Sequence, residues 1–379
     1  MRDFKDIKRI VIKIGSSSLV NKNLSINDNM IDNIMHNIKM LKDKGIDVAL
    51  VSSGAIASGM YELNLNKKPK ELSLKQACAS VGQARLMEIY NLKASKYNLH
   101  IGQILLNHDD FEVRLRMNYL TQTLDSMFIN NIIPIINEND TLAVEEIKVG
   151  DNDTLAALIS PMVQADLLIL FSDIDGLYDK NPKLYNDAKL ISDVYEINDD
   201  IVNMASGATS NVGTGGMSTK INAANIVTLA NSNMIICNSN QIDKLLDIVE
   251  GVEIGTLFHK RINSISSREH WMIFKTNSKG YVVVDDGLSQ KLNDTKVSIL
   301  PKGIISVSGN FINNSIIDIK NKNGDILAKG ITNYSSSEIN LIKGRSTNKL
   351  EEILGYKGKG TIIHANNLVL LKELLWKIS

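Results

Sequence analysis

Residues 9–18 read RIVIKIGSSS, a mainly apolar run followed by a glycine and three serines. The run is strand-sized and ends abruptly in small polar residues, a pattern typical of a buried parallel strand that delivers a loop to the sheet edge. Asp47–Ser52 and Ile132–Ile136 end in the same way, in a Ser-Gly pair and in Asn137–Asp140. Ligands of open α/β sheets bind beyond the carboxyl ends of parallel strands, so we expect these clusters to share one crevice.

Strand-like and helix-like stretches alternate up to about Leu257, which predicts a three-layer α/β sandwich with a mostly parallel sheet. Leu167–Phe171 and Met234–Cys237 are the remaining strands expected in this part, and Thr154–Ile159 and Ile221–Ala230 are expected helices. We therefore predict a first domain over residues 1–258.

Charged and Ser-rich residues break the alternation, and we predict a linker over residues 259–278. Residues 279–379 form short β-rich pieces between Asp-Asp-Gly, Pro-Lys-Gly and Asn-Gly turns, which predicts a small β-barrel-like second domain. Its expected strands are Tyr281–Val284, Ile304–Ser308, Ile316–Ile319 and Thr361–Ile363.

The composition excludes several classes of protein. With 379 residues, 44% hydrophobic and 22% charged, the chain resembles ordinary globular proteins of two domains and not disordered ones. Its apolar runs are far below the roughly 20 residues of a membrane span, and its start lacks a secretory signal. Lys+Arg and Asp+Glu balance at 42 each, so overall charge favours no nucleic acid or membrane partner. Two cysteines and six scattered histidines predict neither disulfides nor a metal site, and we expect a cytoplasmic protein.

Two lysines stand where phosphate could bind. Lys13 lies at a strand end before Gly15, where exposed backbone N–H groups and an ammonium group can hold phosphate oxygens. The glycine-rich segment 213–220 ends in Lys220 at the expected helix start, whose free N–H groups favour anions. The alternatives are a plain exposed lysine and a flexible loop with a capped helix. A P-loop is disfavoured because no G-x-x-x-x-G-K-[ST] sequence occurs.

Acidic and amide residues gather at Asn137–Asp140 and at 150–153. Asn and Asp together can bind the ammonium and carboxylate groups of an amino acid, and Asp153 could orient both lysines. The alternative is that Asp151 or Asp153 only caps the following helix.

Two strand ends carry hydroxyl groups. Ser172 and Asp173 could meet a nucleotide's ribose or base, although Ser-Asp before Asp175-Gly176 is also a common turn. Ser53 could donate to a substrate carboxylate, or it could serve as an ordinary helix N-cap.

Taken together and in order, these segments resemble the amino acid kinase family, and most closely its members that phosphorylate L-glutamate. The resemblance covers essentially the whole chain, because the part from about Gly280 resembles a PUA domain. The phrases that carry it are VSSGAIASG (51–59), PIINENDT (134–141), IKVGDNDTLAAL (147–158), SDIDGLY (172–178), GTGGMSTK (213–220) and GTLF (255–258).

The resemblance implies roles for individual residues. Lys13 and Lys220 would contact the ATP phosphates and stabilise the transferring phosphoryl group, with Asp153 organising the two lysines. Ser53, Asp140 and Asn152 would hold glutamate. The nucleotide would be bound by Lys13 and by Ser172, Asp173, Thr214, Gly215, Gly216, Met217, Ser218, Thr219 and Lys220. Ser172 replaces a threonine that is common in the family and keeps its hydroxyl group.

The resemblance also implies the reaction and its setting. ATP, with Mg²⁺, would phosphorylate the L-glutamate γ-carboxylate to L-glutamyl 5-phosphate, the first step of proline biosynthesis. Proline would be a feedback inhibitor, a glutamyl phosphate reductase would receive the unstable product, and the enzyme would be a homo-oligomer, either a dimer or a tetramer.

Two other functions compete with this one. The first is a kinase of the same fold that acts on aspartate, acetylglutamate or a phosphorylated small molecule. The second is an RNA-binding or RNA-modifying protein, because PUA-like domains are best known on such enzymes. Against the second, the tail lacks aromatic residues between basic clusters and has Arg345 as its single arginine.

Overall fold

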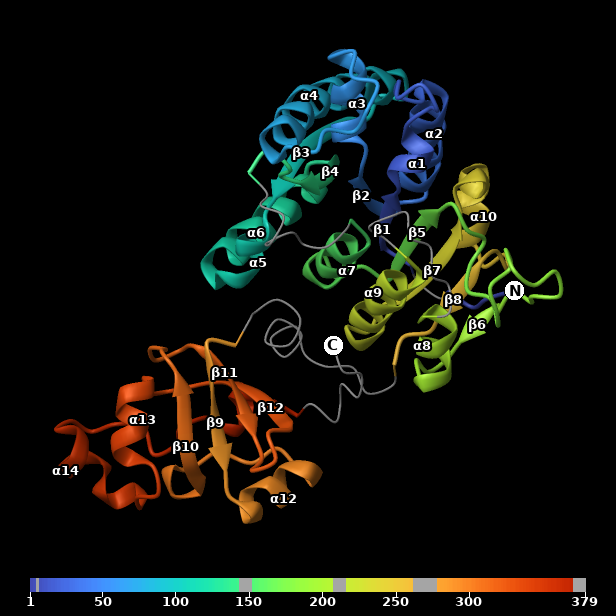
Figure 1. The fold of residues 1–379 in the computed structure, drawn as a ribbon. Coiled ribbons are helices and arrows are strands. Elements are labelled where there is room, and N and C mark those ends of the chain that lie inside the picture. The colour runs from blue at the N-terminus through green and yellow to red at the C-terminus, as the bar shows by residue number, and fades with distance from the viewer. Residues whose placement is uncertain (5–6, 143–151, 207–215, 262–277, 371–379) are drawn as a thin grey trace. The chain divides into compact units, whose positions relative to one another are not determined.

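The computed structural model describes residues 1–4, 7–142, 152–206, 216–261 and 278–370. The chain divides into two compact units, Met1–Ile265 and Ser266–Ser379, each with a sheet and a hydrophobic core of its own (Figure 1). Most of the predicted linker 259–278 lies outside the described residues.

An eight-stranded sheet forms the centre of the first unit, in the order β3-β4-β2-β1-β5-β7-β8-β6. Neighbouring strands are parallel except β7 and β8, which confirms the prediction of a mostly parallel sheet. The strands are β1 (Arg9–Ile14), β2 (Asp47–Ser52), β3 (His100–Leu106), β4 (Ile132–Glu138), β5 (Leu167–Ser172), β6 (Asp193–Val194), β7 (Asn233–Asn238) and β8 (Thr256–Phe258).

Strand β1 lies in the middle of this sheet, between β2 and β5. Side chains alternate between the two faces of a strand, and Ile10, Ile12 and Ile14 all belong to the core that includes α2 (Asp28–Asp43), α4 (Leu72–Lys96) and α10 (Leu245–Val249). Lys13 therefore points to the opposite face, which α7 (Asn152–Met162) covers. Helices thus cover both faces of the sheet (Figure 1), as in the predicted three-layer sandwich.

Amphipathic spacing explains helix α2 of this core. In α2, Ile31, Ile34, Met35, Ile38 and Leu41 recur at helical spacing and are buried, and the Asn27 side chain caps the helix by accepting from the Met30 N–H at 3.1 Å. The other helices of this unit are α1 (Ser16–Leu19), α3 (Ala55–Glu62), α5 (His108–Glu112), α6 (Arg114–Ile129), α8 (Asp199–Ser206), α9 (Met217–Leu229) and the 3₁₀-helix Ser239–Lys244.

Helices α3 and α4 pack in backbone contact through two glycines. A Cβ atom at Gly59 would lie 1.8 Å from the carbonyl oxygen of Cys78, and one at Gly82 would lie 1.9 Å from that of Ala55. No other residue fits at these positions without separating the helices. The pair therefore forms one closely joined element.

The second unit contains a five-stranded sheet in the order β10-β9-β11-β12-β13. Strands β9 and β11 are parallel and the other pairs are antiparallel. The strands are β9 (Gly280–Val284), β10 (Ile304–Gly309), β11 (Ile316–Lys320), β12 (Ile326–Ile331) and β13 (Leu368–Leu370). The helices are α12 (Asp286–Asp294), α13 (Ser336–Ile342) and α14 (Leu350–Leu354), with 3₁₀ turns at Pro301–Gly303, Thr347–Lys349 and Ala365–Asn367.

The strands predicted from apolar runs agree with the structure to within two residues at each end, with one exception. The prediction of a strand at Thr361–Ile363 is wrong, because Ile363 forms only an isolated bridge to Ile299. Ile362 and Ile363 pack into the core without forming a continuous ladder of backbone hydrogen bonds, and their burial explains the apolar pattern in the sequence.

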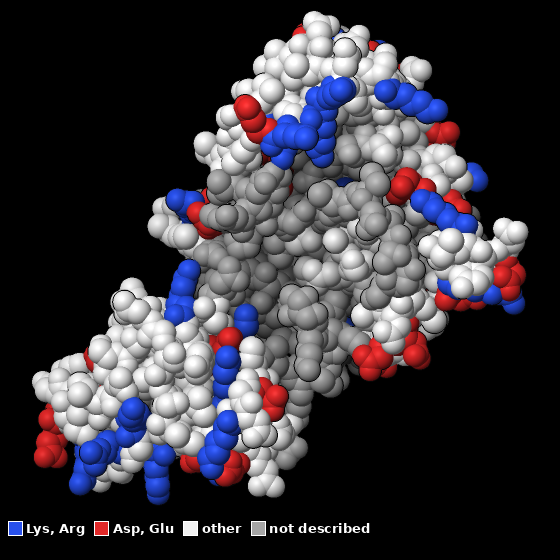
Figure 2. Space-filling model, in the orientation of Figure 1, with Lys and Arg blue, Asp and Glu red and all other residues white. Residues whose placement is uncertain are grey.

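The drawn face carries acidic and basic side chains, with basic ones gathered at the upper edge of the first unit and over part of the second (Figure 2). In the described part of the chain, no helix is both long enough and apolar enough to cross a membrane.

Candidate active site

Three buried charged residues meet beside β1. The Lys13 ammonium lies 2.6 Å from Oδ1 of Asp153, and the Lys220 ammonium lies 2.7 Å from Oδ2 of the same carboxylate. Asp153 is 2% exposed, Lys13 8% and Lys220 5%. One carboxylate therefore holds two ammonium groups, one on each oxygen.

The charges of this triad do not cancel. Burial alone raises the pKa of the Asp153 carboxyl, but the neighbouring Lys13 and Lys220 charges outweigh it and leave the pKa below its usual value. Asp153 is thus an anion at neutral pH, and the three residues together carry one net positive charge. A buried excess of positive charge is expensive unless an anion joins it, so the triad is suited to bind an anionic group.

Each member of the triad stands at the end of a secondary-structure element. Lys13 is paired in register with Val51 on one side and Leu170 on the other, so it is fixed at the centre of the sheet. Asp153 lies in the first turn of α7, and Lys220 lies in the first turn of α9. The two helices pack on each other, which brings the second lysine to the carboxylate.

Asn152 connects the triad to a second polar group. Its amide nitrogen donates to the Ser53 hydroxyl at 2.6 Å, to the Ser52 carbonyl at 3.0 Å and to the Asn137 side-chain oxygen at 3.0 Å. Three protein acceptors therefore surround the nitrogen, and within the described part of the chain the side-chain oxygen of Asn152 is left to accept from a ligand. Because Asn152 and Asp153 are adjacent in sequence, this acceptor lies next to the two lysines.

The structure excludes the capping interpretation of Ser53. Helix α3 has Gly54 as its N-cap, at φ +100°, and the Ser53 hydroxyl accepts from Asn152 instead. Asp153 likewise contacts the lysines instead of serving as the N-cap, because it is the second residue of α7. Asp151 lies outside the described residues.

Asp140 follows β4 by two residues and is half-buried. Asn137, in the same strand, is 2% exposed and accepts from both Asn152 and the Glu138 N–H. Asn137 belongs to the polar cluster expected from the sequence but is not among the predicted site residues. The signal was present, since a buried strand rarely ends in an asparagine without a partner.

The predicted nucleotide residues fall into two described groups. The Ser172 hydroxyl donates to Asp173 Oδ1 at 3.0 Å, at the end of the strand next to β1. Gly216 caps α9, and the Thr219 hydroxyl donates to its carbonyl at 2.8 Å. Met217 and Ser218 complete the first turn of α9, while Thr214 and Gly215 lie outside the described residues.

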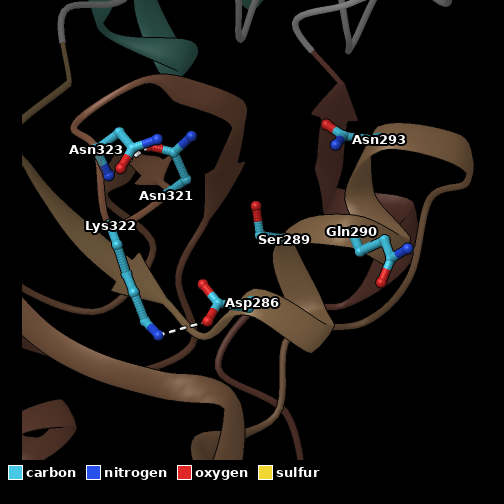
Figure 3. A pocket seen from close by; sticks show the side chains of 7 residues that line it. All are labelled: Asp286, Ser289, Gln290, Asn293, Asn321, Lys322 and Asn323. Carbon is cyan, nitrogen blue, oxygen red and sulfur yellow. Dashed lines mark hydrogen bonds and ion pairs between the residues drawn. The ribbon is translucent and has the colours of Figure 1, made fainter.

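A separate hollow of about 310 Å³ lies in the second unit, between α12 and the turn from β11 to β12 (Figure 3). It is lined by polar side chains, and its two charged groups, Asp286 and Lys322, form an exposed ion pair at 2.6 Å. No buried charge points into it, so it lacks the electrostatic feature that distinguishes the triad. Its lining residues are Asp286, Ser289, Gln290, Asn293, Asn321, Lys322 and Asn323.

Comparisons with known proteins agree on both units. Residues 8–238 match the model of the amino acid kinase family, and residues 280–354 match that of the PUA domain. A protein of Caldanaerobacter subterraneus subsp. tengcongensis named glutamate 5-kinase is 45% identical over 96% of this chain and 98% of its own length. Proteins of the same name from Thermoanaerobacter sp. and Methanococcoides burtonii are each 41% identical, over 96% and 97% of this chain and 98% of their own lengths.

Proposed function

The chain belongs to the amino acid kinase family and carries a PUA domain, and from this premise we propose that it is a glutamate 5-kinase. The reaction would transfer the γ-phosphoryl group of ATP to the γ-carboxylate of L-glutamate. The observation that carries the proposal is the Lys13–Asp153–Lys220 triad, because two ammonium groups fixed on one carboxylate suit phosphoryl transfer.

Positioning and charge supply the catalysis in this proposal. The glutamate γ-carboxylate, with an unperturbed pKa of about 4.3, is ionised at neutral pH and needs no general base. One of its oxygens attacks the γ-phosphorus in line, and the bond from that phosphorus to the β–γ bridging oxygen breaks. ADP leaves with the bond's electrons, and L-glutamyl 5-phosphate remains. Lys13 and Lys220 neutralise charge on the transferring group, and Asp153 keeps both ammonium groups in place.

The acceptor amino acid would bind at Ser53, Asp140 and Asn152. The Asn152 side-chain oxygen and the Asp140 carboxylate would accept from the α-ammonium group of glutamate, since both are acceptors. The Ser53 hydroxyl can in turn donate to a carboxylate oxygen. The adjacency of Asn152 and Asp153 would then place the glutamate side chain beside the lysines.

The nucleotide would bind at Ser172, Asp173 and the segment Gly216–Lys220, with Thr214 and Gly215 as further predicted contacts. The start of α9 offers free backbone N–H groups for phosphate oxygens. Mg²⁺ would accompany ATP and supply neutralisation of the phosphate charge. In the described part of the chain, no three His, Cys, Asp or Glu side chains gather as metal ligands.

Hydroxylamine trapping tests this function directly. The purified protein with ATP, Mg²⁺ and hydroxylamine should form a hydroxamate with L-glutamate, because hydroxylamine captures acyl phosphates. Aspartate and N-acetylglutamate serve as competing acceptors under the same conditions. Faster hydroxamate formation with either of them would reject glutamate as the substrate.

Further proposals concern the setting of the reaction. The product would enter proline biosynthesis through a glutamyl phosphate reductase, with proline as feedback inhibitor of a cytoplasmic homo-oligomer, either a dimer or a tetramer. We keep the domain limits 1–258 and 279–379, with 259–278 as a linker, as part of this proposal. Titration of the hydroxamate assay with proline tests the inhibition, and loss of activity should follow increasing proline.

A further inference from the structure

Helix α4 supplies a buried glutamine that the reaction described above does not use. Gln83 lies midway along α4 and is 8% exposed, although its neighbours Ala84 and Arg85 are exposed. Its side-chain oxygen accepts from the Asn137 amide nitrogen at 2.9 Å. Burying a glutamine is costly unless its polar atoms are used, so this contact needs a reason.

Gln83 fixes the direction in which the Asn137 amide points. With its nitrogen donating to Gln83, Asn137 turns its oxygen toward the Glu138 N–H at 2.9 Å and the Asn152 amide nitrogen at 3.0 Å. The reverse orientation would place the Asn137 nitrogen against two donors. The Glu138 backbone N–H, which cannot be reversed, selects the same orientation independently.

The orientation of the Asn137 amide also affects that of Asn152. Because the Asn137 oxygen, the Ser52 carbonyl and the Ser53 hydroxyl all face the Asn152 nitrogen, Asn152 must present its oxygen on its other side. A chain of three amides, Gln83–Asn137–Asn152, therefore runs from α4 to the proposed acceptor site. Its last member offers a hydrogen-bond acceptor to the ligand.

Helix α4 is also held firmly against the strand ends that carry this site. Gly82, next to Gln83, lies against the Ala55 carbonyl so closely that no side chain fits. The Tyr90 hydroxyl lies 2.9 Å from that of Ser52, and burial raises the pKa of Tyr90, so the phenol stays protonated. The helix thus contacts the end of β2, the end of β4 and the start of α3, and Gln83 has little freedom to move away.

We propose that Gln83 is a positioning residue for the acceptor substrate, acting through Asn137 to make Asn152 an acceptor for an α-ammonium group. This inference rests on the proposed binding of the amino acid at Ser53 and Asn152. With the Asn152 oxygen held in this position, the site would prefer acceptor substrates that have a free amino group to those that lack one.

Substitution of Gln83 tests the inference. Gln83→Met keeps the length of the side chain and removes its acceptor, so Asn137 keeps only its contacts with Glu138 and Asn152, and both asparagine amides are held less firmly in their orientation. We expect the KM for glutamate to rise at least about tenfold, while kcat and the KM for ATP change less than about threefold. The ratio of kcat/KM for glutamate to kcat/KM for glutarate, which lacks the ammonium group, should fall by a similar factor. Gln83→Glu keeps an acceptor toward Asn137 and should restore most of the affinity for glutamate.

Gln103→Met is the matched control, because Gln103 is an exposed glutamine of the same unit, on β3, and it should leave all constants unchanged. If Gln83→Met does not fold, Gln83→Asn, whose amide is one methylene too short, makes the same comparison. An unchanged KM for the acceptor substrate would overturn the inference. An equal rise in the KM for the acceptor and in the KM for ATP would also overturn it. The constants are measured with whichever amino acid the wild-type enzyme prefers, so a wrong assignment of glutamate is detected separately.

Discussion

Asp153 and Asp193 of the first unit each face two basic side chains, and the two carboxylates differ in how those side chains are used. Asp153 is buried between Lys13 and Lys220, and in the described part of the chain the two ammonium groups have no other ionic or hydrogen-bond partner. Asp193, at the far edge of the sheet, is 25% exposed and lies 2.8 Å from His259 Nε2 and 3.9 Å from Arg2 Nε.

The two terminal nitrogens of the Arg2 side chain are held by the protein backbone. Its guanidinium donates to the carbonyls of Ile254 and Ser192 at 2.7 Å and to that of Gly255 at 2.9 Å. A lysine ammonium has three donors, so Lys13 and Lys220 keep donors that can turn to a ligand. The comparison separates charges that hold a fold together from charges arranged to receive a substrate.

Asp153→Asn should have the largest effect, because it leaves two buried ammonium groups facing a neutral amide. Removing one partner of a buried ion pair costs about 3–5 kcal/mol of the free energy of unfolding, and phosphorylation should fall as well. Differential scanning calorimetry of both proteins measures the stability loss.

The pH dependence identifies the group responsible. Because the folded pKa of Asp153 is below its unfolded value of 3.8, its stabilisation is complete above that value and is lost as pH falls through the folded pKa. The difference in Tm between wild type and Asp153→Asn should therefore stay constant near neutrality and shrink below about pH 4. If the difference in Tm already shrinks at pH 6–7, the loss of stability belongs to another titrating group.

Lys220→Ala should lower kcat by about 10²–10³-fold, the usual loss when one charge-stabilising donor is removed. The Tm should change little, because Asp153 keeps its contact with Lys13. Steady-state hydroxamate kinetics measure the effect. The control is Lys44→Ala, at an exposed lysine whose ion pair with Glu250 lies away from the triad. Near-normal turnover of Lys220→Ala would refute the role of this lysine.

Arg2→Ala should show the opposite pattern and lower the free energy of unfolding by about 2–3 kcal/mol. Three backbone carbonyls lose a charged donor, while nothing near the triad changes. Urea denaturation measures the stability, and turnover per folded molecule should equal that of the wild type. A kcat loss comparable to that of Lys220→Ala would erase the proposed distinction between the two carboxylates.

His259→Ala should have the smallest effect, about 1 kcal/mol or less, because its hydrogen bond to Asp193 is partly exposed to water. The ring also stacks on Tyr195 with centroids 4.1 Å apart. Tyr195→Ala removes only the stacking, so the difference in Tm between the two variants isolates the hydrogen bond. A loss as large as that of Arg2→Ala would mean that His259 holds this edge together.

Much of the sheet could be predicted because apolar runs in parallel strands are short and unmistakable. Apart from the half-buried Arg9 and Asp47 that begin β1 and β2, strands β1, β2 and β5 are buried, so the sequence pattern and the structural role coincide. Strand β3 was missed because it is partly exposed and contains Gly102 and Gln103, and β12 was missed because Lys329-Gly330 interrupts its pattern.

The site was only partly predictable for a different reason. Lys13, Asp153 and Lys220 follow recognisable strand ends and helix starts, so local patterns named all three. Gln83 belongs to a helix whose polar and apolar residues show no clear facial pattern, and its burial depends on a partner 54 positions away. Such a contact exists only in the folded chain, so the sequence around Gln83 does not predict that its side chain is buried.

The contacts of Arg2 also constrain the order of events during synthesis. Arg2 leaves the ribosome before the strands of the first unit, and its carbonyl partner at Gly255 is made 253 residues later. At about 5–20 residues per second, that interval lasts roughly 10–50 s. The contacts of Arg2 with Ile254 and Gly255 can therefore form only after most of the first unit has emerged.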